Sequence, residues 1–233
     1  MTSQGRPYAG ASRETRESAR RERIIAAGTE LFGTRGYRAA TVGAVCETAG
    51  LNKRYFYESF ATLEDLLCEV YEYVVADLRA AVLAGGGTGA PEALAGGGDG
   101  APGVLAEDGR TGPEVLRGFI AAFLDWAQVN PVEAKVHLFE VLGVSARVDE
   151  LYRSYARSIG EELVDRLAAV SSGPALTAGN RRILGDVLVG AGIQIVVDWV
   201  ISGYEPPRQE LLDDIDATVG WAMAASMAAF GFW

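Results

Sequence analysis

Apolar side chains recur at helical spacing along most of this 233-residue chain. Ile24, Ala27 and Leu31 lie three and four residues apart, so they share one face of a helix predicted over residues 13–32. No alternation of apolar and polar residues persists long enough to predict a β-strand. The pattern therefore indicates an all-α protein. The further helices that it predicts span residues 62–84, 113–129, 131–144, 148–170, 176–202 and 206–230.

A short amphipathic segment follows the first helix. Val42, Val45 and Cys46 are spaced for one face of a helix, and Thr41 before them is a suitable N-cap. Gly50 can adopt the left-handed backbone conformation that ends a helix and turns the chain sharply. A second short helix can therefore start directly after this turn.

That second helix is predicted to start after Asn52, another good N-cap. Leu51, Phe56 and Phe60 are expected to face the preceding helix, which leaves cationic and phenolic side chains outward. Such side chains suit phosphates and base edges, so the two helices predict a helix-turn-helix that docks on DNA. The simpler alternatives are that the tyrosines belong to the core and the cations to a solvated surface. The outward residues are Lys53, Arg54, Tyr55 and Tyr57.

The segment 16–67 resembles the N-terminal domain of the tetracycline-repressor-like (TetR) family of one-component transcriptional regulators. The likeness rests on the stretches RIIAAGTELFGTRGYRAATV and AGLNKRYFYESF, which start at Arg23 and Ala49. The resemblance implies a three-helix DNA-binding domain over residues 13–61. It also implies a larger helical domain over residues 62–233 that binds an effector and dimerises.

The resemblance also implies roles for single residues. Thr41 and Tyr57 correspond to phosphate-contacting residues of the family, and the short helix from Lys53 to the major-groove reader. One departure is that Leu63 stands where the family often has a lysine, so the Thr62 hydroxyl and the helix N-terminus are left to face a phosphate. The expected DNA-contacting residues are Thr41, Asn52, Lys53, Arg54, Tyr55, Tyr57 and Thr62.

The net charge of -10 by itself argues against a nucleic-acid partner. Its distribution changes this interpretation, because residues 1–64 carry ten Arg or Lys against seven Asp or Glu, and the remainder carries 11 against 24. Phosphates repel an acidic body, so the molecule is expected to approach DNA through its basic end only. Arginines of the first helix could contact phosphate, or form a solvated charged surface.

Two segments have a composition unlike the rest. Residues 1–12 are small and polar and predict a disordered arm, and residues 85–112 are rich in Gly, Ala and Pro and predict a flexible insertion. No charged-then-apolar signal is visible at the N-terminus, so we expect a cytoplasmic protein. The apolar run 183–203 is interrupted by Asp186, Gln194 and Asp198, which argues against a membrane span.

The last two predicted helices have apolar or small residues on more than one side. A helix that is apolar on two sides must be covered on two sides. In the TetR family this pair forms a four-helix interface, and two-fold symmetry would place two reading helices roughly 34 to 36 Å apart. The resemblance thus implies a homodimer through 176–202 and 206–230, although both sides could also be filled within one subunit.

The remaining helices are expected to enclose a small-molecule effector, as the resemblance implies. Candidate lining residues combine aromatic area with a few polar groups, which is typical of ligand pockets. With two cysteines in apolar segments, no CxxC spacing and one histidine, neither a metal site nor a cofactor is expected. The candidate effector-binding residues are Trp126, His137, Glu140, Tyr152, Tyr155, Gln194, Asp198 and Trp199.

The function expected from these features is that of a repressor rather than an enzyme. It would bind a palindromic operator as a homodimer and leave it when the effector binds. Two alternatives stay open at this stage. One is a helical enzyme that uses His137 and Glu140 as acid and base, although no nucleophile or metal cluster accompanies them. The other is a DNA-binding dimer that takes no effector.

Overall fold

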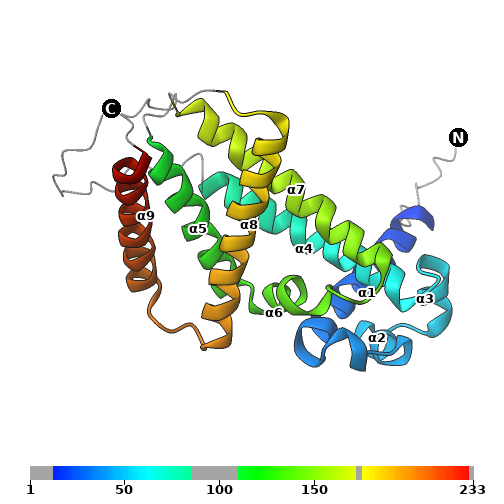
Figure 1. The fold of residues 1–233 in the computed structure, drawn as a ribbon. Coiled ribbons are helices and arrows are strands. Elements are labelled where there is room, and N and C mark those ends of the chain that lie inside the picture. Colours follow the sequence, from blue (N-terminus) through cyan, green and yellow to red (C-terminus); the bar gives the residue numbers. More distant parts are fainter. Residues whose placement is uncertain (1–12, 86–109, 172–174, 231–233) are drawn as a thin grey trace, which may run out of the picture.

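A computed structural model describes residues 13–85, 110–171 and 175–230, and all regular elements in these ranges are helical (Figure 1). The predicted arm over 1–12 and nearly all of the insertion predicted over 85–112 lie outside the described residues. The α-helices are α1 Arg13–Arg35, α2 Val42–Ala49, α3 Lys53–Ser59, α4 Leu63–Gly85, α5 Gly112–Val129, α6 Pro131–Lys135, α7 Ala146–Ala169, α8 Ala178–Ile201 and α9 Arg208–Phe230. A 3₁₀ turn, η1 Tyr37–Ala39, and a π-helical turn, η2 Val136–Glu140, complete the set.

The local signals around α2 and α3 act as the sequence predicts. The Thr41 hydroxyl accepts a hydrogen bond from the Ala44 amide, and the Asn52 side chain accepts one from the Tyr55 amide. Gly50 has φ 62° and ψ 38°, which is the left-handed conformation expected at the end of α2. Both caps and the turn of the helix-turn-helix are confirmed.

The helix predicted over residues 131–144 is shorter than expected. A single turn of α6 passes into η2, which ends at Glu140. Gly143 then adopts a positive φ of 74°, and Ser145 starts α7 by accepting a hydrogen bond from the Val148 amide. The chain therefore turns between residues 141 and 145. The other predicted helices are present with ends shifted by a few residues.

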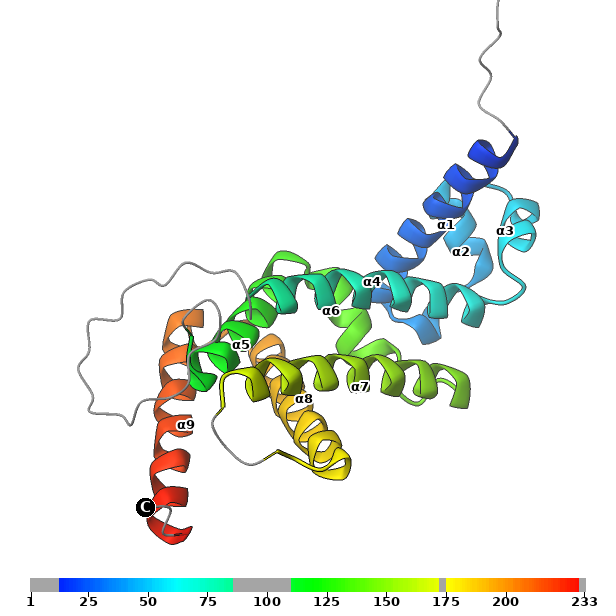
Figure 2. The ribbon, with the colours of Figure 1, turned by 90° about the horizontal axis from the view of Figure 1, so that it is seen from above.

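The α4 helix links the two ends of the molecule. Figure 1 shows α1, α2 and α3 gathered at one end and α8 and α9 towards the other, and Figure 2 shows α4 running from the first group into the body alongside α7. Its first half packs Leu66 and Val70, both with no exposed surface, against α1. A second connection is made where Gly33 of α1 lies directly against the backbone of Val132 in α6, too close for any side chain at position 33.

The α8 helix is unusually exposed for so apolar a segment. By length and composition alone it could cross a membrane, because its most apolar 18-residue stretch has a mean hydropathy of 1.7. Only 22% of that stretch is buried. One side packs tightly, since the backbones of Gly160 in α7 and Gly185 touch at the crossing. The other side leaves Ile183, Val187 and Ile201 more than half exposed. An exposed apolar surface of this kind is typical of an interaction site.

Candidate DNA interface and ligand cavity

The α3 helix separates its two faces clearly. Phe56 is fully buried, whereas Lys53 and Arg54 are exposed and the Tyr57 side chain is 59% exposed. Arg54 forms an ion pair with Glu58 one turn later, 2.8 Å between nitrogen and oxygen, and this contact aligns its guanidinium along the helix. The exposed face thus offers an ammonium, a guanidinium and a phenol to a partner.

Lys53 extends towards the first turn of α2. Its Cε atom lies 3.7 Å from the position that a Cβ on Gly43 would occupy, and the Thr41 hydroxyl lies 3.8 Å from the same point. The ammonium, the hydroxyl and the N-terminus of α2 are therefore neighbours. A helix N-terminus carries partial positive charge and free amide groups, so these groups together suit a phosphate.

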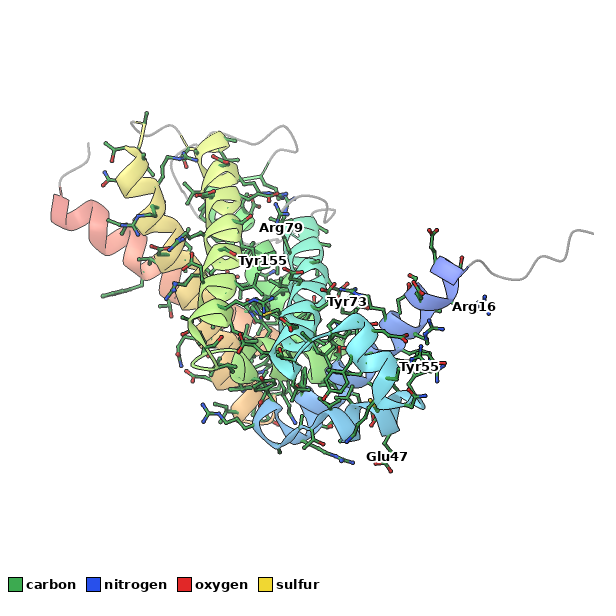
Figure 3. All side chains as sticks on the ribbon, turned by 90° about the vertical axis from the view of Figure 1, so that its right-hand side faces the viewer. Arg16, Glu47, Tyr55, Tyr73, Arg79 and Tyr155 are labelled. Atoms are coloured by element: carbon green, nitrogen blue, oxygen red, sulfur yellow. The ribbon has the colours of Figure 1, made fainter. Side chains whose placement is uncertain are left out.

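Arg20 of α1 joins this surface through Tyr55. Its guanidinium lies 4.5 Å from the centre of the Tyr55 ring, a cation–π contact that fixes the half-buried tyrosine and places a second cation beside α3. Figure 3 shows Tyr55 and Arg16, also on α1, on the same side of the domain. The sequence marks the arginines of α1 as possible phosphate contacts, but the pairing of Arg20 with Tyr55 depends on how the helices pack.

Thr62 is less available than the sequence suggests. Its hydroxyl donates to the Asp65 carboxylate at 2.8 Å and accepts from the Asp65 amide at 3.0 Å, which closes the first turn of α4. Two hydrogen bonds occupy the hydroxyl, and the carboxylate beside it would repel a phosphate. The structure thus favours the groups on α2 and α3 as DNA contacts.

A small cavity of about 20 Å³, room for about one water molecule, lies in the body between α4, α5, α7 and α8. Its wall includes Tyr71, Phe123, His137 and Tyr152, which are joined by ring contacts around the histidine. The Tyr71 ring stacks on His137 with an interplanar angle of 3° and 5.8 Å between centroids. The remainder of the wall is mostly aliphatic.

His137 is the polar centre of this wall. Burial lowers the pKa of its imidazole to about 4, so the ring is neutral at physiological pH. Its Nδ1 atom is buried and has no hydrogen-bond partner. Burial also raises the pKa of the Tyr71 hydroxyl, which stays protonated. The cavity is therefore uncharged and holds an unsatisfied polar atom.

The structure places four of the eight candidate effector residues at or beside this cavity. His137 and Tyr152 line it. Trp126 packs its ring edge-on to His137 at 6.5 Å, while its indole N–H donates to Asp77 at 2.7 Å. Tyr155 contacts the Tyr71 ring, 6.0 Å between centroids, from outside the lining.

The other four candidates lie elsewhere, and the expectation is corrected for them. Gln194 donates to Asp198 at 2.8 Å, and both lie on the exposed side of α8. The Trp199 indole donates to the carbonyl of Pro206, which anchors the turn between α8 and α9. Periodicity could not separate these positions from the lining, because α8 is apolar on nearly every side.

Glu140 also points away from the cavity. Its carboxylate accepts a hydrogen bond from the Tyr37 amide at 2.7 Å, so the end of η2 holds the junction between α1 and α2. His137 and Glu140 thus lie in different environments, the cavity wall and the junction with Tyr37. They do not form the acid–base pair that the enzyme alternative requires. Among the described residues, no group of three or more His, Cys, Asp or Glu side chains could hold a metal ion.

These elements define a class of protein: a helix-turn-helix domain joined to a helical body that encloses a cavity. Residues 24–70 match the model of the bacterial regulatory proteins of the tetR family. No curated protein matches the chain. This segment therefore resembles the DNA-binding domain of that family, and the resemblance inferred from the sequence is confirmed for it.

Solved structures extend the likeness to the body. The fatty acid degradation regulator FadR from Bacillus halodurans superimposes with a TM-score of 0.65 at 14% identity, over 85% of this chain and 93% of its own. A putative tetR family regulator from Shewanella sp. PV-4 gives 0.62 at 15% identity, over 88% and 97%. FadR from Bacillus subtilis, solved in complex with stearoyl-CoA, gives 0.62 at 14% identity, over 84% and 95%. The whole chain therefore has the TetR-type fold.

Proposed function

We propose that this protein is a homodimeric repressor that binds a palindromic operator and is released from it by a small-molecule effector. The carrying observation is the exposed cationic and phenolic face on α3, together with a helical body in which a buried histidine with an unpartnered Nδ1 atom lines a small apolar cavity. Lys53, Thr41 and Tyr57 bind phosphates, and Arg54 and Tyr55 face base edges. Because the DNA-binding end is basic and the body acidic, the molecule approaches DNA in one orientation.

A second copy of the chain is proposed to cover the exposed sides of α8 and α9. Val187 of α8 is 59% exposed and Trp221 of α9 is 72% exposed. Figure 1 shows α9 at the end of the molecule away from α3. A two-fold axis through these helices buries the same patch on both subunits. The proposed dimer also accounts for an apolar α8 that a single subunit leaves largely uncovered. A helix covered in this way is consistent with the cytoplasmic location expected from the sequence.

Two structural links are proposed to carry the ligand signal. The first is α4, which contributes Tyr71 to the cavity and Leu66 to the core of the DNA-binding domain. The second is η2, in which His137 lines the cavity. Glu140, three residues after His137, accepts a hydrogen bond from the Tyr37 amide. A ligand that moves this turn moves the attachment of α1 with it. To convert nearly all molecules from the DNA-binding conformation to the released one, the ligand must bind the released conformation about 5.5 kcal/mol more tightly.

The unpartnered Nδ1 atom of His137 favours a ligand-responsive regulator over a dimer that takes no effector. A buried, unpartnered polar atom in an apolar cavity is costly without a ligand group to pair with it. Stearoyl-CoA in the similar FadR structure from Bacillus subtilis supports the use of this fold for a small-molecule effector.

Selection of bound duplexes from a random DNA pool by the purified full chain tests the proposal. A palindrome with two half-sites about one helical turn apart is the expected result. The matched control is a chain with Lys53, Arg54 and Tyr57 all changed to Ala, which should enrich no sequence. An enriched site without two-fold symmetry, or equal enrichment by the triple variant, would contradict the proposal.

A further inference from the structure

Two arginines of α1 lie against aromatic side chains of the helix-turn-helix. Arg20 lies over the Tyr55 ring of α3, at 4.5 Å from its centre. Arg21 lies 5.2 Å from the centre of the Phe60 ring, just after α3, and pairs with Glu69 of α4 at 2.6 Å between nitrogen and oxygen. These contacts hold α3 and the start of α4 against α1.

A third arginine of α1, Arg23, bonds to the turn itself. Its Nη2 atom donates to the Ala49 carbonyl at 2.5 Å and to the Gly50 carbonyl at 3.4 Å. Ala49 is the last residue of α2, and Gly50 is its left-handed cap. A Cβ on Gly50 would lie 3.1 Å from the same nitrogen, so the guanidinium lies directly on the turn. Arg23 thus joins α1 to the point at which the chain changes direction between α2 and α3.

The end of α2 explains why a cation is favourable at this position. The amides of Gly50 and Leu51 bond to carbonyls within the last turn of α2. The carbonyls of Ala49 and Gly50 follow these, and Arg23 supplies a donor to both. The C-terminus of a helix carries partial negative charge, so it favours a guanidinium and disfavours a phosphate.

The two ends of α2 therefore differ in what they can bind. At the N-terminus, Lys53 and the Thr41 hydroxyl suit a phosphate. At the C-terminus, a phosphate would compete with carbonyl oxygens for Arg23 and would meet the negative end of the helix. Only two residues separate the bonded turn from Lys53, the first residue of α3. Arg23 is thus placed to hold the turn rather than to contact DNA.

We propose that Arg23 is a positioning residue for DNA recognition, which fixes the turn between α2 and α3 and so sets where Lys53 and Arg54 meet the DNA. Arg20 holds the same helix through the Tyr55 ring. The inference rests on the proposed function, because it assigns how the reading helix is aligned. A loosened turn leaves the cations free to meet phosphates but disturbs their alignment with base edges, which carry the sequence information.

Binding of Arg23→Ala to the selected palindrome and to a scrambled duplex tests the inference. The ratio of the two affinities is expected to fall about tenfold, because a misaligned helix loses base contacts. The salt dependence of binding to the scrambled duplex should stay that of the wild type, since no phosphate contact is removed. Arg35→Ala is the matched control, because Arg35 is exposed, ends the same helix and carries the same charge. It should leave the ratio unchanged.

The ratio distinguishes positioning from two simpler roles. A loss of overall stability lowers the folded fraction and weakens binding to both duplexes equally. A lost phosphate contact also weakens both, and it lowers the salt dependence. An unchanged ratio in folded Arg23→Ala overturns the inference. A lowered salt dependence for the scrambled duplex overturns it as well, because Arg23 would then contact phosphate.

Hydrogen exchange of the free protein tests the same contact without DNA. The Leu51 amide, 2.9 Å from the Cys46 carbonyl, is expected to exchange about tenfold faster in Arg23→Ala and at the wild-type rate in Arg35→Ala. Arg23→Met, which keeps an apolar stem, gives the same comparison if the alanine variant does not fold. Wild-type exchange in a folded Arg23 variant overturns the inference. A wild type that binds both duplexes equally contradicts the proposed function instead, and exchange then decides the inference alone.

Discussion

Two lysines allow a matched comparison at the residue scale. Lys53 and Lys135 are the only lysines of the chain, and both are exposed on helices. Lys53 lies beside the first turn of α2 with the Thr41 hydroxyl, whereas Lys135 ends α6 in the body. Removing either lysine changes the net charge by the same amount. A comparison of the two variants therefore distinguishes a local phosphate contact from the general effect of net charge.

Lys53→Ala is therefore expected to weaken binding to every DNA sequence, because one phosphate contact is lost. The slope of the logarithm of the binding constant against the logarithm of the salt concentration should fall by about one unit. Lys135→Ala changes the net charge equally and should leave both quantities nearly unchanged. Fluorescence anisotropy titrations at several salt concentrations measure the two effects. Equal losses in the two variants would mean that Lys53 acts only through net charge.

His137 predicts a pH dependence of stability. The unfolded chain binds a proton at this ring below a pKa of about 6.5, whereas the folded chain does so only near pH 4. Between these values the unfolded state binds more protons, so stability falls as the pH is lowered through this window, by up to about 3 kcal/mol. The neighbouring Tyr71, Tyr152 and Tyr155 hydroxyls do not titrate in this range.

Urea unfolding of the wild type and of His137→Phe at pH 7 and pH 5 measures this contribution. The wild type should lose more stability than the variant over the same interval, and the difference isolates the histidine from surface carboxylates. Parallel losses in both proteins would show that the imidazole is not buried in its neutral form.

At the scale of elements, the η2 turn connects cavity and DNA-binding domain over a very short distance in sequence. His137 contacts the aromatic rings of the cavity wall. Glu140, three residues after it, accepts a hydrogen bond from the Tyr37 amide. Extra residues in π-helical turns are common at functional sites, because they redirect side chains locally. A displacement of this turn therefore acts on both sites at once.

Glu140→Ala is expected to leave ligand affinity within about twofold but to raise the ligand concentration for half-release of DNA about tenfold, since a charge-assisted hydrogen bond is worth about 1.5–3 kcal/mol. Glu161→Ala on the exposed side of α7 is the control. Release curves measured by anisotropy on labelled operator give the comparison. A curve for Glu140→Ala that overlays the wild type would mean that α4 alone carries the signal.

The sequence predicts local features of these elements better than their packing. Thr41, Gly50 and Asn52 act through neighbouring backbone groups, so the helix-turn-helix can be predicted without knowledge of the rest of the chain. The lining of the cavity depends on helix rotation, which apolar spacing does not define for α8. This is why Gln194 and Asp198 were expected inside and lie outside. The ring partners of His137 come from three helices, α4, α5 and α7, and leave no pattern in sequence.

On the scale of the whole molecule, α3 and α9, which carry the proposed DNA-binding and dimerising surfaces, lie at opposite ends (Figure 1). This separation lets a change in the body alter the spacing of two α3 helices, provided that the dimer persists. The proposed dimer makes a direct prediction for α8. An aspartate at an apolar two-fold interface is buried twice without a partner.

Val187→Asp is therefore expected to raise the dimer dissociation constant at least about 100-fold. Leu142→Asp is the control, because Leu142 is also half exposed but lies in the turn before α7. Sedimentation velocity across a concentration series distinguishes monomer from dimer. If Val187→Asp remains dimeric, the two subunits meet through another surface.

The central claim is sequence-specific binding by a two-fold dimer. The most direct test titrates the purified chain against the selected palindrome and a scrambled duplex of equal length, at two salt concentrations. The account predicts an affinity for the palindrome at least about 10³-fold higher, one dimer per duplex, and a steep fall of affinity with salt for both duplexes. Equal affinity for the two duplexes, or one monomer per palindrome, would contradict it.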